Sequence, residues 1–225
     1  MLGLKGEKCG HAYTDEAIKW LETHYRSFLD VANEFDLSDD VILAAAMAVT
    51  EEYSNRKNVH ALSDLIQDTM IRAGLLLYID DFWRPDVGPG NINIDTAMTL
   101  KNKIASDLSY KLESKKEVNS KFGSKIEMAQ YLLTADGTAL IGALEMHRVT
   151  RRYLSEDKYK ADDMSIANKI QNMVDIWREG DGRYDRMDEK LQKNNKHVPE
   201  HKYKNQPNIP IHNYETIRKI MKLDQ

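Results

Sequence analysis

Two adjacent carboxylates, Glu51 and Glu52, lie just after an uninterrupted run of nine apolar residues at 41–49. A carboxylate at the end of a buried helix is partly surrounded by apolar side chains, which disfavour its charged form and raise its pKa. Such a glutamate can stay protonated near neutral pH and act as a general acid. Helical periodicity puts both glutamates beside apolar residues and does not choose between them. The alternative interpretation is a pair of solvated glutamates at a helix end.

A second stretch with chemical potential starts at the Gly88-Pro89-Gly90 turn and ends near residue 95. Glycines there permit close approach of the backbone to a ligand. The residues after the turn alternate between two sides of an extended segment, Ile92 and Ile94 on the apolar side, Asn91, Asn93 and Asp95 on the polar side. We expect a short polar edge on an apolar backing, followed by a helix that Asp95 or Thr96 caps.

Helical spacing of apolar residues predicts the elements that must position these groups. Helices are expected from Thr14 to about 32, from Ser38 to about 56, from 59 to a stop near Gly74, over 95–112, from Ser124 to 133, beyond a break at 135–137, over 164–177 and over 213–221. The helix at 38–56 is apolar on all sides and is therefore predicted to be central and buried. The fold class is mainly α (α+β), with a small extended or β-hairpin insertion within 75–95.

Composition argues against nucleic-acid binding, an internal disulfide and a metal site. A net charge of -4 gives no general attraction to nucleic acid. The single cysteine, Cys9, excludes an internal disulfide, and no Cys/His spacing resembles a zinc site. The acidic residues Asp80, Asp81 and Asp86 lack the regular spacing of a calcium loop, so we expect neither metal nor cofactor.

No apolar run approaches the roughly 20 residues of a membrane span, and residues 1–8 lack the apolar region of a secretion signal. We therefore expect synthesis in the cytoplasm without a signal peptide and no membrane insertion. Any export or delivery to the periplasm or cell wall would need another route.

Two motifs together resemble the lysozyme-like superfamily, especially goose-type lysozymes and soluble lytic transglycosylases. Glu52-Tyr53-Ser54-Asn55 is similar to the glutamate motif that ends a buried helix in those families, and the run from Gly90 to Ala97 is similar to their Gly-Leu-Met-Gln-Ile segment, which lines a sugar cleft. A weaker similarity joins residues 176–180 and Tyr184 to an aromatic-Asn-x-Gly element on a late helix. The resemblance extends over about residues 38–185, and its variant motifs are most similar to muramidase toxin domains of bacterial secretion systems.

The resemblance implies that Glu52 is the general acid, because it fits the Glu-x-x-Asn spacing, and that mutation of Glu51 costs much less activity. It makes Asp95 the leading candidate to position water and Asp86 the next; if neither does so, a lytic transglycosylase becomes the better description. The implied substrate-binding residues are Gly90, Asn91, Ile92, Asn93, Tyr78, Trp83 and Tyr184. Tyr53, Asn93 and Arg178 depart from the usual Ser, Gln and Asn, which affects the sugar contacts.

The resemblance implies that residues 1–190 form a lysozyme-like catalytic domain. The polar composition beyond residue 191 predicts an arm, followed by a short C-terminal helix, so that 191–225 pack on the same domain. The expected activity is hydrolysis of the β-1,4 MurNAc-GlcNAc bond of peptidoglycan, as an antibacterial effector with a cognate immunity protein. A lytic transglycosylase or phage endolysin of the same fold and a non-enzymatic helical binding module are the alternatives.

Overall fold

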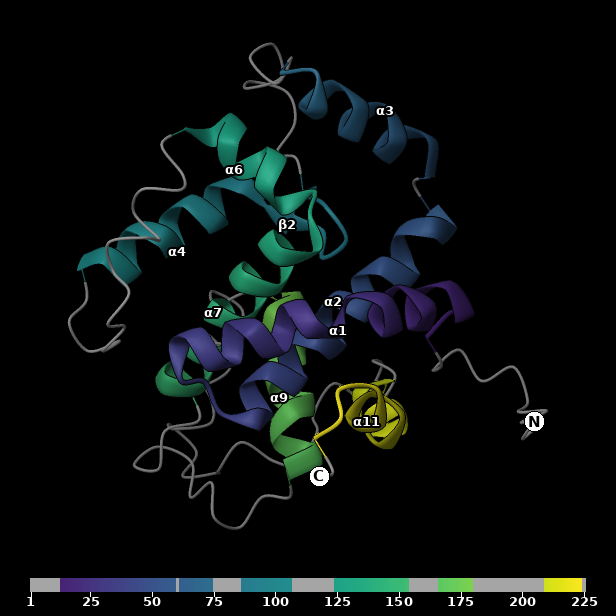
Figure 1. Ribbon diagram of the computed structural model, residues 1–225, viewed down its shortest axis with the longest axis vertical. Helices are drawn as coiled ribbons and strands as arrows, with labels where there is room; N and C mark the ends of the chain where they lie inside the picture. The colour runs from purple at the N-terminus through teal and green to yellow at the C-terminus, as the bar shows by residue number, and fades with distance from the viewer. Residues whose placement is uncertain are drawn as a thin grey trace, which may run out of the picture.

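The computed structural model describes residues 13–59, 61–74, 86–106, 124–153, 166–179 and 209–223. Over these residues the chain is mainly helical with one two-stranded sheet, which confirms the predicted class (Figure 1). The elements are α1 (Asp15–Phe35), α2 (Asp39–Val59), α3 (Ala61–Arg72), β1 (Asp86–Val87), β2 (Ile92–Asn93), α4 (Ile94–Ser106), α6 (Lys125–Leu132), α7 (Ala135–Tyr153), α9 (Ile166–Glu179) and α11 (Ile209–Ile220).

Helix α2 is the centre of the fold. Every side chain in the apolar run 41–49 is at most 3% exposed, which confirms the predicted buried central helix. A helix that is apolar all round has to be covered all round, and α2 packs against α1, α7, α9 and α11. Four alanines in this run keep the helix narrow, so its neighbours can approach closely. No helix within the described ranges is both long and apolar enough to cross a bilayer.

Helix α1 covers one side of α2 and crosses in front of it in Figure 1. The Thr14 side chain accepts a hydrogen bond from a backbone amide of the first turn, as predicted for the cap. One face of the amphipathic helix is buried, with Leu21 and Phe28 fully covered. The helix ends at Phe35. The next residue, Asp36, has a left-handed backbone (φ 51°), and its amide donates a hydrogen bond to the Ala32 carbonyl.

The predicted hairpin is formed by β1 and β2, which pair antiparallel with Asp86 opposite Asn93 and Val87 opposite Ile92. Val87, Ile92 and Ile94 are buried, whereas Asn93 is half-buried. The predicted alternation of an apolar and a polar side is therefore confirmed. Because Val87 and Ile92 join the main core, the hairpin is fixed against the helices.

The expected cap of the following helix is wrong. Helix α4 begins at Ile94, so Asp95 and Thr96 lie inside its first turn. The Asn93 side-chain oxygen accepts hydrogen bonds from their backbone amides, at 3.0 and 3.2 Å respectively. Asn93 is thus the residue that satisfies the free amides at the start of α4.

Helices α6 and α7 follow each other with a short interruption. Ser124 opens α6, as predicted, through a capping box with Glu127. The predicted break at 135–137 is displaced, because α7 already begins at Ala135. Thr134 accepts a hydrogen bond from the Gly137 amide at 3.0 Å, so the interruption lies at 133–134.

Three other helix boundaries can be compared with the predictions from the sequence. Val59 belongs to the end of α2 and not to the third helix. Gly74, with φ 75°, stands just after α3 in the left-handed conformation expected there. Helix α11 begins at Ile209, ahead of the predicted start, and packs against α9, α2 and α1. The predicted domain division near residue 190 lies outside the described residues.

Candidate active site

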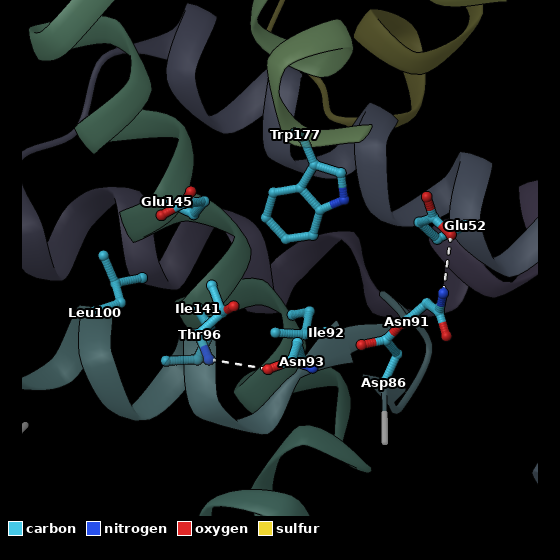
Figure 2. Close-up of a pocket in the computed structure, with 10 residues that line it drawn as sticks. All are labelled: Glu52, Asp86, Asn91, Ile92, Asn93, Thr96, Leu100, Ile141, Glu145 and Trp177. Atoms are coloured by element: carbon cyan, nitrogen blue, oxygen red, sulfur yellow. Dashed lines mark hydrogen bonds between the residues drawn. The ribbon is translucent and has the colours of Figure 1, made fainter. Parts of the chain in front are cut away.

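A pocket of about 230 Å³ lies where α2, the hairpin, α4, α7 and α9 converge (Figure 2). It is smaller than the roughly 300–1,000 Å³ of typical small-molecule sites, so a polymer would enter it with only part of its length. The lining residues are Glu52, Asp86, Asn91, Ile92, Asn93, Thr96, Leu100, Ile141, Glu145 and Trp177. The first five of these were candidates from the sequence, although they come from segments more than 30 residues apart.

The two adjacent glutamates differ in their surroundings. Glu52 is half-buried and lines the pocket, whereas Glu51 is only 3% exposed and does not line it. Successive residues on a helix point about 100° apart, which is why one carboxylate faces the pocket and its neighbour is covered by the protein. The expectation that these glutamates end the helix is wrong, because α2 continues for seven residues beyond Glu52, to Val59. A pair of solvated glutamates does not describe them either.

Asn91 brings an amide group to Glu52. Its backbone has φ 50°, a left-handed conformation that Asn tolerates better than most residues. The backbone amide of Asn91 donates a hydrogen bond to the Gly88 carbonyl at 3.0 Å. From this turn, Asn91 Nδ2 donates a hydrogen bond to Glu52 Oε2 at 3.4 Å. The strained turn residue is therefore the one that contacts the candidate acid.

The glycines of the turn approach the protein itself. A Cβ atom on Gly88 would lie 1.8 Å from the Leu132 carbonyl oxygen, and one on Gly90 would lie 2.9 Å from the Thr138 methyl carbon and 3.2 Å from a Val49 methyl carbon. Gly90 is buried and does not line the pocket, which differs from its expected role beside a ligand. The absent side chains let the turn dock on α6, α7 and α2, which holds Asn91 in place.

Asn93 and Asp95 do not share one role. Asn93 lines the pocket while its side-chain oxygen caps α4. The Asp95 side chain is 63% exposed, forms an ion pair with Lys125 at 2.9 Å and is not among the pocket residues. The structure therefore does not bring the leading candidate for positioning water into the pocket.

Asp86, the second candidate, does line the pocket. It is the exposed first residue of β1, opposite Asn93 in the hairpin, and its backbone carbonyl accepts a hydrogen bond from Gln67 at 3.4 Å. In Figure 2 it lies near Asn91, on the same side of the pocket as Glu52.

Glu145 is a pocket carboxylate that the sequence analysis missed. It belongs to α7 and is bound by Arg148 of the same helix through two contacts, Nε to Oε2 at 2.8 Å and Nη2 to Oε1 at 2.5 Å. The two side chains are only 13% and 9% exposed. The only sign of Glu145 in the sequence is its position four residues after the apolar Ile141. Such spacing is found both for residues that line a pocket and for residues on a solvated helix face.

Trp177, near the end of α9, supplies the large aromatic surface of the pocket. In Figure 2 its indole lies in the middle of the pocket, between Glu145 on one side and Glu52 on the other. Gly142 of α7 lies beside the ring, since a Cβ atom on it would be 4.0 Å from the indole, an ordinary contact distance. The residue occurred only in the weaker part of the resemblance.

Three sequence candidates, Tyr78, Trp83 and Tyr184, lie outside the described residues. The side chain of Arg178 does as well. Their proposed contacts with a ligand remain predictions.

The pocket combines acid groups, amides and an aromatic ring, a set suited to a polar ligand with apolar faces. A carboxylic acid can donate a proton, a carboxylate can accept one, and Asn91 and Asn93 can bind carbonyl or hydroxyl groups. Within the described ranges, no group of three or more His, Cys, Asp or Glu side chains is arranged to hold a metal ion.

Comparisons with known protein families, curated proteins and solved structures found no match to this chain.

Proposed function

We propose that this protein is a peptidoglycan glycan-strand hydrolase that cleaves the β-1,4 MurNAc-GlcNAc bond by general acid catalysis. The observation that carries the proposal is the contact between Glu52, at the pocket edge of the buried helix α2, and Asn91 of the hairpin turn. The two motifs that resemble the lysozyme-like superfamily thus meet across one pocket. Chance similarity of two short motifs gives no reason for them to lie together.

In the proposed reaction, protonated Glu52 gives its proton to the glycosidic oxygen as the C1–O bond breaks. Asn91 supports this role because a neutral amide fixes the position of the carboxyl group without adding a charge beside it. Ile92 and Ile141 add apolar surface to the same pocket.

Trp177 is the proposed stacking surface for a sugar ring. The apolar face of a pyranose packs against an aromatic ring while its hydroxyl and N-acetyl groups bind to polar side chains at the edge. Asn91 and Asn93 provide such side chains within the same pocket. The pocket would hold the sugars at the scissile bond, and the remainder of the strand would lie outside it.

Lytic transglycosylation is the second candidate reaction. It needs the acid but no carboxylate to activate water, and the exposed, ion-paired Asp95 lies away from the pocket. Released muropeptides separate the two reactions, because hydrolysis produces reducing ends and transglycosylation produces anhydro ends.

The proposed setting is an antibacterial effector delivered to the periplasm or cell wall, with an immunity protein that covers the pocket in the producing cell. This part of the proposal rests on the resemblance to muramidase toxin domains. A phage endolysin has the same chemistry in another setting. Neighbouring genes, an immunity protein in one case and a holin in the other, distinguish them.

Digestion of purified peptidoglycan tests the function. Wild type should release soluble muropeptides and Glu52→Gln should not, with unchanged helical circular dichroism. Binding to insoluble peptidoglycan without turnover by wild type would instead favour a non-enzymatic binding module.

A further inference from the structure

Glu145, which lines the pocket opposite Glu52 in Figure 2, belongs to a largely buried ion pair. Glu145 and Arg148 lie on one face of α7, and the guanidinium group holds both oxygens of the carboxylate, at 2.8 and 2.5 Å. Their side chains are 13% and 9% exposed. This geometry fixes the carboxylate far more firmly than an exposed pair three residues apart on a helix surface would.

Burying such a pair costs desolvation energy that its own attraction only partly offsets, so it is weak evidence for a role in stability. Other residues of α7 near Glu145 are apolar and buried, including Ile141 and Leu144, which are 1% exposed. An apolar residue at 145 would fit that surface. A pocket function gives a reason for placing a fixed carboxylate there.

We propose that Glu145 is the second carboxylate of the site, the one that accepts a proton from the attacking water; this inference rests on the proposed hydrolase function. As Glu52 gives its proton to the leaving oxygen and the C1–O bond breaks, the water oxygen forms a new bond to C1. The proton that this water loses goes to Glu145. Exchange with solvent then returns one proton to Glu52 and removes one from Glu145, so the cycle needs no other reactant.

The position of Glu145 favours it over the two aspartates. In an inverting glycosidase, water attacks the sugar on the face opposite the leaving group, so the base and the acid lie on opposite sides. Figure 2 shows Glu145 and Glu52 on opposite sides of Trp177, whereas Asp86 lies on the Glu52 side. Asp95 is 63% exposed, bound to Lys125 and outside the pocket.

Arg148 acts in this scheme as a positioning residue. Its two-pronged contact leaves the Glu145 carboxylate one main orientation, and its charge balances a carboxylate that has little contact with solvent. Arg148→Lys keeps the positive charge but loses the paired hydrogen bonds of the guanidinium group to both carboxylate oxygens. It should lower kcat with little change in KM, because the substrate does not have to contact Arg148.

The experiment compares Glu145→Gln, Glu145→Ala and the exposed control Glu22→Gln on purified peptidoglycan. Glu145→Gln should release reducing ends roughly 10²–10⁴-fold more slowly than wild type, with a larger fraction of anhydro ends, because the sugar's own hydroxyl can still attack C1. Glu145→Ala in sodium azide should recover turnover and form a glycosyl azide of inverted configuration, since the anion needs no base. Recovery also shows that this variant folds.

Wild-type rate and products in Glu145→Gln would overturn the assignment of Glu145. Failure of azide to restore a Glu145→Ala variant with wild-type circular dichroism would do the same. Both results leave the proposed function intact if Glu52→Gln is inactive. A wild-type protein that releases no muropeptide contradicts the proposed function itself, and the Glu145 assignment with it.

Discussion

Asn91 Nδ2 donates a hydrogen bond to Glu52 Oε2 across 39 positions of sequence, from the hairpin turn to the central helix. The donor and acceptor atoms are 3.4 Å apart. Asn91 reaches Glu52 from a left-handed backbone, φ 50°, which most residues adopt only with strain. The turn thus holds Asn91 in a disfavoured backbone conformation from which its side chain contacts one carboxyl group.

Replacing Asn91 with Gly tests this contact without disturbing the backbone, because glycine adopts the same φ readily. We expect kcat/KM on peptidoglycan to fall about tenfold, the effect of losing about 1.4 kcal/mol of interaction in the transition state. Asp36→Gly is the matched control, since Asp36 has φ 51° at the end of α1. Equal activity of the two variants would show that the Asn91 amide has no role in turnover.

Gly88 tests how the hairpin is held on the helices. In Gly88→Ala the new methyl group would lie 1.8 Å from the Leu132 carbonyl oxygen, so the turn has to move. Gly74 has a similar φ, 75° against 73°, but its Cβ would meet nothing within 4 Å. Both variants carry a backbone penalty of about 1 kcal/mol, and only Gly88→Ala should lose clearly more in urea unfolding and also lose activity. Equal unfolding free energies would contradict the packing described for the turn.

Trp177 should contribute to substrate binding more than to the chemical step. We expect Trp177→Leu to raise KM roughly two- to tenfold with a smaller change in kcat, because a stacked ring contributes about 0.5–1.5 kcal/mol. Trp177→Phe keeps an aromatic face and should lie nearer to wild type. Steady-state kinetics on a soluble peptidoglycan fragment measures both constants. If the Leu and Phe variants have the same KM, the ring does not stack on the sugar.

Asp40 links stability to pH. Burial alone would raise the pKa of this carboxyl group, but hydrogen bonds from Lys169 and Ser38 and the charge of Lys169 outweigh burial and lower the pKa below its ordinary value of 3.8. The unfolded chain therefore binds this proton more readily than the folded protein does. The stabilising contribution is complete above about pH 4 and is lost as the pH falls through the folded pKa.

Asp40→Asn should therefore be less stable than wild type at pH 6, and the difference should shrink as the pH falls below about 4. Urea unfolding at several pH values measures it. The ion pair with Lys169 joins the start of α2 to α9, the helix that carries Trp177. A difference that stays constant from pH 6 to pH 3 would show that the carboxylate charge does not contribute.

The parts of the site that follow local rules were predictable. Nine consecutive apolar residues require a buried helix, and the alternation after Gly90 places Asn91 and Asn93 on a polar edge. Glu52 and Asn91 were both candidates, but nothing local to either segment shows that they touch. That contact depends on how the hairpin docks against Leu132, Thr138 and Val49.

Glu145 was not predicted, and Trp177 occurred only in the weaker part of the resemblance, because nothing local to α7 or α9 shows which of their side chains line the pocket. Only the packing of α7 and α9 on α2 shows which polar residue lies beside Glu52. The expected cap role of Asp95 was wrong for a related reason: α4 begins two residues earlier than expected, at Ile94, and Asp95 is an exposed partner of Lys125. Register errors of this size are common at helix ends, and they change the side on which a residue lies.

The choice of a control for Glu52 also depends on packing that the sequence does not show. Glu51 was the expected control, but it is only 3% exposed, and a substitution there would disturb the core as well as the charge. Glu22 on α1 is exposed and lies on an element that does not line the pocket, so Glu22→Gln changes one carboxyl group to an amide without either effect.

The most direct measurement is the initial rate of soluble muropeptide release from purified peptidoglycan by wild type, Glu52→Gln and Glu22→Gln at equal concentration. The proposed acid role predicts that Glu52→Gln is at least roughly 100-fold slower while Glu22→Gln equals wild type, with the same helical circular dichroism in all three. A Glu52→Gln protein that releases muropeptides at the wild-type rate would contradict the account.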